Sequence, residues 1–106
     1  MKKICVEDYE VEVRTQNGVE KTMYEVKTSI VNVLFNPELR LSSIDLLSQN
    51  KLAEKILNHK TSEILLEDAE YNKIKQAFDT VKGFVKNDVE LVRRVLEAED
   101  VSVVEK

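Results

Sequence analysis

Two residues could carry chemistry by their type alone, because the chain has one histidine, His59, and one cysteine, Cys5. Histidine takes and releases protons near neutral pH, so His59 could act as a general base beside Glu54 or Glu63. No nucleophile can be placed next to the ring, and a solvent-facing histidine at a helix end fits the pattern better. Cys5 lacks nearby basic residues or a helix start that would activate its thiol, which favours a small apolar strand residue.

Carboxylates are numerous, but their spacing does not indicate a catalytic pair. Neighbours such as Glu67/Asp68 and Glu99/Asp100 are explained by helix capping and by a solvated helix end. The acidic calcium loop, the P-loop and the His-Glu-x-x-His zinc motif do not occur. One histidine and one cysteine also exclude most histidine and thiolate metal centres. We therefore expect no metal, no cofactor and no enzymatic activity.

A set of basic residues near the C-terminus is the alternative site. It consists of Lys75, Lys82, Lys86, Arg93 and Arg94. The lysines follow one another at steps of seven and four residues, so they could share one helix face, and the two arginines follow on the next helix. Such a stripe could bind the phosphate of a nucleotide or a nucleic acid. Interspersed acidic residues and the lack of an aromatic platform favour a solvated face instead.

Length and composition limit the class of protein. The 106 residues suit one domain spanning residues 1–106, with 42% apolar and 34% charged residues and a net charge of −4. An acidic balance argues against broad nucleic-acid binding. The longest apolar-rich run, residues 30–35, is far too short to span a membrane, and acidic residues follow the start too soon for a signal peptide. We expect a cytoplasmic protein.

The N-terminal quarter predicts a β-hairpin. Asn17 and Gly18 form the pair preferred at the centre of a type I′ turn, between two alternating segments. That turn would place Val11 opposite Tyr24 on an apolar face, with the charged residues on the other face. The apolar alternation changes phase near residues 7–8, where we expect a bulge or bend.

The rest of the chain reads as helices with two short strands. Thr28-Ser29 predicts a cap for a short helix over residues 30–35 that stops before Pro37, although a third strand is the alternative. A further helix should begin at Ser42 or Ser43 and reach about Asn58. The predicted C-terminal elements are a strand over 63–66, a helix from Glu67 or Asp68 to Gly83 with its apolar seam reaching Val85, a helix from Asn87, and a strand over 101–103 beside the first.

Together these elements predict an α+β fold: an N-terminal antiparallel hairpin, a helical region and a C-terminal β-α-α-β-like unit. We expect the helices to carry more apolar residues than the core of so small a chain needs, which favours a surface buried between chains. The predicted interface comprises Ile30, Val31, Leu34, Phe35, Tyr71, Ile74 and Phe78. The function that follows is a non-enzymatic interaction or assembly protein that binds itself or another protein.

The stretch from Glu63 to Tyr71, continued through two helices to a Val-rich tail at 101–103, resembles small accessory proteins of phages and prophages of low-GC bacteria. The resemblance covers about residues 62–104 and carries over no site residue. It implies a cytoplasmic protein made during infection or lysogeny that acts by binding another protein, as assembly helpers and inhibitors of host functions do.

Overall fold

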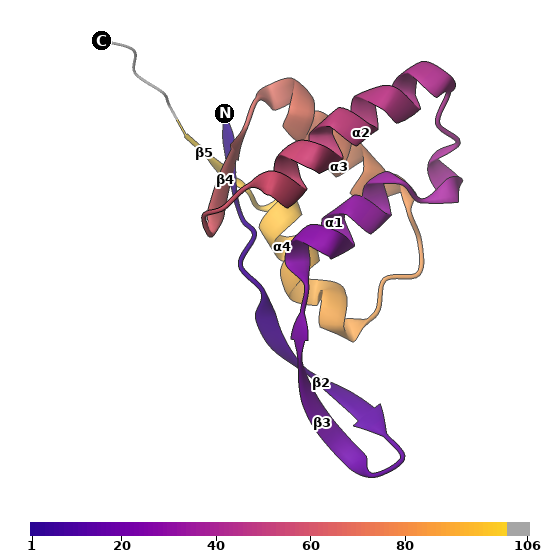
Figure 1. Cartoon of the computed structure of the whole chain (residues 1–106), viewed down its shortest axis with the longest axis vertical. Coiled ribbons are helices and arrows are strands. Elements are labelled where there is room, and N and C mark those ends of the chain that lie inside the picture. Colours follow the sequence, from indigo (N-terminus) through magenta and orange to yellow (C-terminus); the bar gives the residue numbers. More distant parts are fainter. Residues whose placement is uncertain (102–106) are drawn as a thin grey trace.

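The computed structural model describes residues 1–101 and confirms a mixed α+β fold (Figure 1). A three-stranded sheet has the order β4-β1-β5, and a separate two-stranded sheet is formed by β2 and β3. The strands are β1 (Lys2–Cys5), β2 (Tyr9–Thr15), β3 (Gly18–Tyr24), β4 (Glu63–Leu66) and β5 (Glu99–Asp100). The helices are α1 (Val26–Leu34), α2 (Ser43–Asn58), α3 (Asp68–Thr80) and α4 (Val89–Leu96), with short 3₁₀ turns η1 (Pro37–Leu39) and η2 (Lys86–Asp88).

Strand β1 is the centre of the larger sheet, paired antiparallel with β4 on one side and with β5 on the other. Its alternation separates two faces. Ile4 lies opposite Ile64, and both side chains are buried beneath the helices. On the other face, Lys3 forms ion pairs with Glu63 at 3.2 Å and Glu99 at 3.3 Å. The N-terminal strand therefore joins two segments that lie far along the chain.

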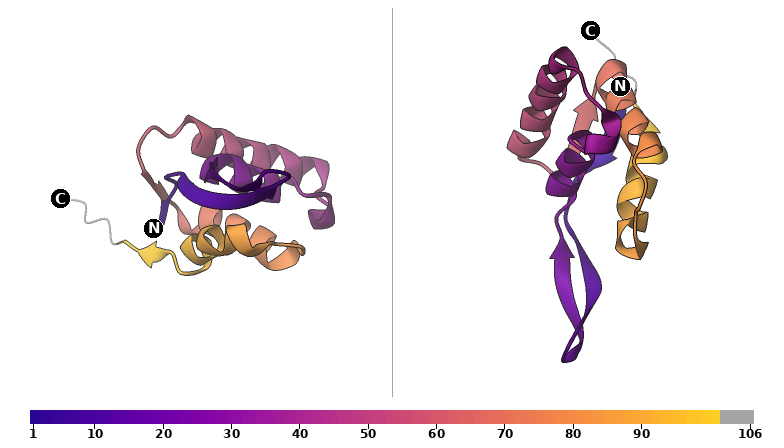
Figure 2. Two further views of the ribbon diagram at one scale, coloured as in Figure 1. Left: turned by 90° about the horizontal axis from the view of Figure 1, so that it is seen from below. Right: turned by 90° about the vertical axis from the view of Figure 1, so that its right-hand side faces the viewer.

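The helices form the bulk of the molecule and cover the inner face of this sheet (Figure 2). Helix α1 packs between α2 and α3, while α4 packs against α3 and β1. The fully buried side chains at the centre of the core are Ile4, Val26, Ile30, Leu34, Ile56, Ile64, Leu66, Ile74, Leu91 and Val95. Strand β4, the start of α2 at its Ser42 cap and the start of α3 at Asp68 agree with the sequence prediction.

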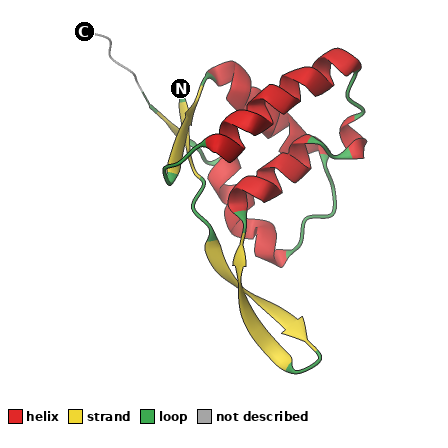
Figure 3. Ribbon diagram, viewed as in Figure 1, coloured by secondary structure: helices red, strands yellow, loops and turns green. Residues whose placement is uncertain are grey.

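The hairpin β2–β3 projects away from the helical body (Figure 3). The predicted hairpin is confirmed, but its register differs by two residues: Val11 lies opposite Thr22, and Tyr24 lies opposite Tyr9. A shift of two residues leaves each side chain on its predicted face, because the side-chain period of a strand is two. The chain leaves β1 before entering β2, so the phase change expected near residues 7–8 is a passage between two sheets.

The turn of the hairpin explains the shifted register. Its two loop residues are Gln16 and Asn17, since Thr15 lies opposite Gly18. A type I′ turn requires positive φ at both loop residues, whereas Gly18, at +116°, is the residue of this turn with positive φ. The turn therefore lies one residue earlier in the chain than predicted. Asn17 is its second loop residue, and Gly18 is the first residue of β3. Glycine is the residue that reaches this φ without strain.

Helix α1 begins at Val26, ahead of the predicted cap at Thr28-Ser29, which lies inside the helix. A side chain distant in sequence replaces the local cap: Asp8 Oδ1 accepts a hydrogen bond from Val26 N at 2.9 Å. Carboxylates that accept from a helix's first N–H groups stabilise that end. The end of the helix at Leu34, two residues before Asn36-Pro37, agrees with the predicted stop.

The C-terminal elements differ from prediction at three points, of which the first is that α4 begins at Val89, while its predicted start, Asn87, lies in η2. Helix α3 ends at Thr80, short of the predicted Gly83. The apolar seam ends at Val81, which is buried, whereas Val85 lies outside the helix and is 65% exposed. Strand β5 lies at Glu99–Asp100 and pairs with β1 and not with β4, and Val101, the described residue of the strand predicted over 101–103, follows it outside a strand. Most of the predicted segment, residues 102–103, lies outside the described part of the chain.

The contact between Asp8 and helix α1 can be tested. Asp8→Ala should lower the free energy of unfolding by about 1 kcal/mol, because it removes the acceptor for Val26 N. Asp8→Asn keeps an acceptor oxygen and should retain most of the stability. Glu7→Ala, at the exposed neighbouring residue, is the matched control and should change stability by less than about 0.5 kcal/mol in urea denaturation. Equal losses for Asp8→Ala and Glu7→Ala would contradict this role of Asp8.

Candidate functional site

The residues predicted for an interface lie mainly in the core of the single chain. Five of them, Ile30, Leu34, Tyr71, Ile74 and Phe78, are at most 6% exposed, and Val31 and Phe35 are half-buried. The helices therefore use their apolar residues on one another. Buried side chains offer no area to a second chain, so a protein-binding surface has to be built from other residues.

The basic residues do not form the predicted stripe. Helix α3 ends at Thr80, so Lys75 lies on it, whereas Lys82 follows it and Lys86 lies in η2. The prediction that the three lysines share one helix face is therefore wrong. Arg93 is exposed and pairs with Glu90 at 3.1 Å and with Glu97 at 3.8 Å. The set is divided among different elements and partly neutralised.

Arg94 has a structural position inside the fold. Its Nη1 donates to the backbone oxygens of Glu7 at 2.6 Å and Cys5 at 3.4 Å, and its Nε donates to Glu90 at 3.0 Å. The guanidinium also lies over the ring of Tyr9, 5.0 Å from the centroid. A planar fork of donors suits this arrangement, in which one side chain holds the link between β1 and β2 against α4.

Two tyrosines fix the base of the projecting hairpin. The rings of Tyr9 and Tyr24 are stacked with centroids 4.7 Å apart. Tyr9 Oη donates to the backbone oxygen of Asn87 at 2.7 Å, and Tyr24 Oη donates to the carboxylate of Asp88. Both hydroxyls thus reach η2, which lies at the start of α4. Burial, followed for Tyr24 by the hydrogen bond to Asp88, raises the pKa of both phenols.

A groove of about 610 Å³ separates the hairpin from η2 and α4. Its hairpin side includes Val11, Arg14 and Val19, and its helical side includes Lys86 and Val89. The lining mixes valines with residues of both charges, and no nucleophile is paired with a base in it. Such a surface suits contacts with a polypeptide, which presents apolar and charged groups together.

The hairpin itself exposes apolar side chains on both of its faces. The exposed fractions are 40% for Val13, 60% for Val19 and 54% for Met23, and Val89 across the groove is 53% exposed. A two-stranded hairpin has no second layer to cover such residues and is marginally stable by itself in water. The projecting hairpin and the groove beside it are thus the candidate site. A second exposed apolar group, Ile44, Leu46 and Leu47, lies on α2.

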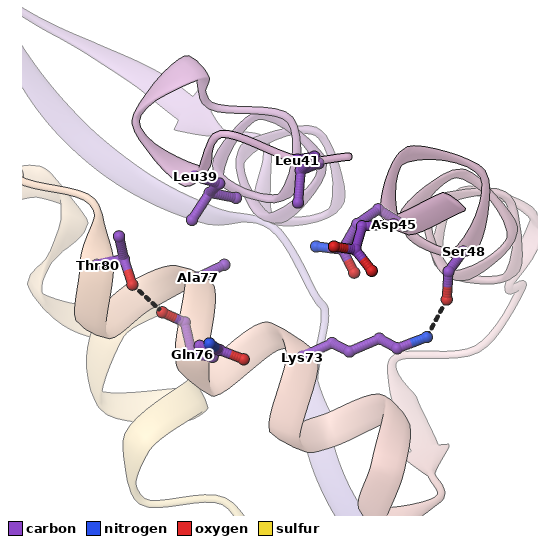
Figure 4. A pocket seen from close by; sticks show the side chains of 9 residues that line it. Leu39, Leu41, Asp45, Ser48, Lys73, Gln76, Ala77 and Thr80 are labelled. Carbon is purple, nitrogen blue, oxygen red and sulfur yellow. Dashed lines mark hydrogen bonds between the residues drawn. The ribbon is translucent and has the colours of Figure 1, made fainter. Parts of the chain in front are cut away.

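A smaller cleft of about 300 Å³ lies between η1, α2 and α3 (Figure 4). Lys73 reaches across it and donates to the hydroxyl of Ser48, and Asp45 and Gln76 also line it. A serine beside a lysine can resemble a nucleophile with its base. Ser48 lies within α2, however, where the backbone N–H groups are used by the helix and cannot stabilise an oxyanion. The geometry of the cleft therefore does not fit acyl transfer.

His59 and Cys5 occupy structural positions. His59 caps the C-terminus of α2, with Nε2 2.7 Å from Thr61 Oγ1 and 2.6 Å from the backbone oxygen of Glu63. The carboxylate of Glu63 pairs instead with Lys3. Cys5 ends β1, and its carbonyl accepts from Arg94.

Among residues 1–101, no group of three His, Cys, Asp or Glu side chains is arranged to hold a metal ion. The helices described here are too short and too polar for any of them to cross a bilayer.

Comparison with known proteins adds no assignment. Neither the protein-family models, nor the curated proteins, nor the solved structures contain a match to this chain.

The sequence pointed to the hairpin but not to its role as a projecting site. Asn87, which supplies the oxygen for Tyr9 and donates its Nδ2 to Glu12 O at 3.1 Å, was read only as a helix start. One available signal was composition: Val19 and Met23 interrupt the charged face of the hairpin, which is unusual for a strand face left to water.

The two neighbouring arginines provide a matched test of the assigned roles. Arg94→Ala should lower the free energy of unfolding by about 2 kcal/mol, since it removes the charged donor to the backbone oxygens of Cys5 and Glu7 and to the carboxylate of Glu90. Arg93→Ala breaks only exposed ion pairs and should cost less than about 0.5 kcal/mol. Urea denaturation of both variants measures the difference. Similar losses for the two would show that Arg94 does not hold the β1–β2 link.

The three tyrosines should make the fold sensitive to alkaline pH. Burial is the largest cause that raises the pKa of Tyr9, Tyr24 and Tyr71 above the usual 10.0. Below pH 10 each phenol is protonated in both states, so stability is unaffected. Above it, the unfolded chain loses these protons first, which favours unfolding.

While the chain is folded, tyrosinate absorbance should therefore appear only at pH values above the usual range for tyrosine titration. Its rise should coincide with unfolding. Tyr24→Phe should flatten the loss of stability between pH 10 and 11.5. A normal tyrosine titration in the folded protein would contradict the assigned burial.

Proposed function

We propose that this chain is a small non-enzymatic interaction protein that binds protein partners through its projecting hairpin. The observation that carries the proposal is the exposure of Val13, Val19 and Met23 on a hairpin that extends beyond the core. Apolar side chains gathered on a projecting element mark interaction surfaces. The base of the hairpin is held by Tyr9 and Tyr24, so it presents these residues in a defined orientation.

The chemistry of the site also favours binding over catalysis. In the groove, Arg14 and Lys86 lie among carboxylates such as Glu10 and Glu90. A mixed lining complements a polypeptide better than it does a polyphosphate, which requires a concentrated positive field. The resemblance of residues 62–104 to phage accessory proteins agrees with a role in assembly or inhibition through protein binding.

Site-specific photocrosslinking tests the proposal. A benzoylphenylalanine replacing Met23 on the hairpin should form covalent protein adducts, with this chain or with another protein, identified by mass spectrometry and reproduced with purified components. The same group replacing Lys75, which is exposed on α3, is the control and should give at least about tenfold less adduct. Adduct formation should fall when Val13 and Val19 are replaced by Ser.

Two results would overturn the proposal. One is equal crosslinking from positions 23 and 75, which would mean that the hairpin is not a binding surface. The other is tight binding of single-stranded nucleic acid at low salt that disappears in the variant Lys75→Glu, Lys82→Glu, Lys86→Glu. That outcome would assign the function to the basic residues.

A further inference from the structure

The two edges of the hairpin differ in what covers them. At the edge of β2, Asn87 Nδ2 donates to the backbone oxygen of Glu12 at 3.1 Å. Residues opposite one another in an antiparallel pair alternate between exchanging hydrogen bonds and pointing their backbone groups outward. Glu12 lies opposite Lys21, and its oxygen points away from β3, so the backbone of Lys21 points away from β2. Every residue from 18 to 23 of β3 is exposed, which leaves its outward groups open to another strand.

Lys21 lies midway between two apolar residues of β3. Val19 and Met23 lie two residues before and two residues after it, so all three share one face of the hairpin. These two apolar side chains are 60% and 54% exposed, more than any other hydrophobic residue of the hairpin. A second β3 running antiparallel, with the two-fold axis at Lys21, would place each Val19 opposite the Met23 of the other copy.

We propose that the hairpin's partner is a second copy of this chain, bound by antiparallel pairing of the two β3 strands in the register centred on Lys21. This inference rests on the proposed function and names the partner for it. The product is a four-stranded sheet with the order β2-β3-β3-β2. Pairing supplies main-chain hydrogen bonds, and the two Val19–Met23 contacts select the register. A two-fold axis makes both contacts at once, as a closed dimer requires.

The charges on this face are compatible with the register. A lysine on an edge strand ordinarily opposes pairing, and here two Lys21 side chains would meet at the axis. Each Lys21 Nζ already lies 3.4 Å from the carboxylate of Glu10, and Glu12 lies directly opposite on β2. The central row of the dimer sheet therefore reads Glu12, Lys21, Lys21, Glu12, with no net charge. Each flanking row runs from Arg14 through Val19 to Met23 and Glu10 of the other copy. The two ends of such a row therefore carry opposite charges.

The contact area of one strand edge is small, so the dimer should be weak and concentration-dependent. Val19→Lys with Met23→Lys should raise its dissociation constant at least about tenfold, because both apolar contacts are replaced by charges. Both positions are exposed, so the variant should fold normally. Sedimentation equilibrium of the full chain measures the change, and Ile44→Lys with Leu47→Lys, at two exposed apolar residues of α2, is the matched control.

Cysteine crosslinking in a Cys5→Ala background tests the register. Paired residues that exchange hydrogen bonds have Cα atoms about 5.5 Å apart, within the range of a disulfide. Lys21→Cys should therefore give a disulfide dimer in a glutathione buffer. Glu20→Cys, one residue away, would face Thr22 of the other copy, with the two cysteines about 8 Å apart, and should give at least about tenfold less. A mixture of the Val19→Cys and Met23→Cys chains should yield the mixed dimer over either homodimer.

The outcomes separate this inference from the proposed function. Equal crosslinking at positions 20 and 21, or a monomer at every concentration, would overturn the β3–β3 dimer. If benzoylphenylalanine at position 23 then still crosslinks to a different protein, the hairpin keeps its binding role with another partner. If it crosslinks to nothing, both proposals fall.

Discussion

The structure depends on the pairing of β1 with two strands from the C-terminal half of the chain. Ile4 and Ile64 form the floor of the core, and α1, α3 and α4 are arranged above it. The same pairing holds the N-terminus against the C-terminal part of the chain, since Val101 N donates to Met1 O at 2.8 Å. A four-residue strand is stable here because it is paired on both sides and covered on one face. Contacts of such high sequence separation can form only when most of the chain is in place.

The pairing of β1 on both sides also accounts for the separate sheet of the hairpin. Both edges of β1 are occupied, so β2 and β3 cannot join it and form a sheet of their own. The hairpin is attached mainly at its base, by the stacked rings of Tyr9 and Tyr24 and by the guanidinium of Arg94, and Asn87 adds a hydrogen bond to Glu12 O along β2. Tyrosine suits such a junction because its ring packs while its hydroxyl reaches a polar partner. Within residues 1–101, no second layer covers the exposed valines and Met23 beyond this junction.

The candidate site was accessible to sequence reasoning only in part. The Asn-Gly pair located the hairpin, and the alternation of Tyr9, Val11 and Val13 assigned its faces correctly even though the register differed. The predicted interface failed to anticipate burial, because the seam on α3 is matched by α1 and α4 of the same chain. The basic set was misread for another reason: its spacing assumed a continuous helix, and the helix ends at Thr80.

The sequence by itself determined the features that depend on neighbouring residues: the hairpin, the Ser42 cap, the stop before Pro37 and the strand at 63–66. Such features follow from local hydrogen bonds and side-chain periodicity, which a short window of residues contains. Only the tertiary structure decided that Asp8 caps α1 and that Arg94 holds the β1–β2 link. It also decided which edge of the hairpin stays open. These depend on residues tens of positions apart meeting at one point, and that meeting is set by closure of the core and not by spacing.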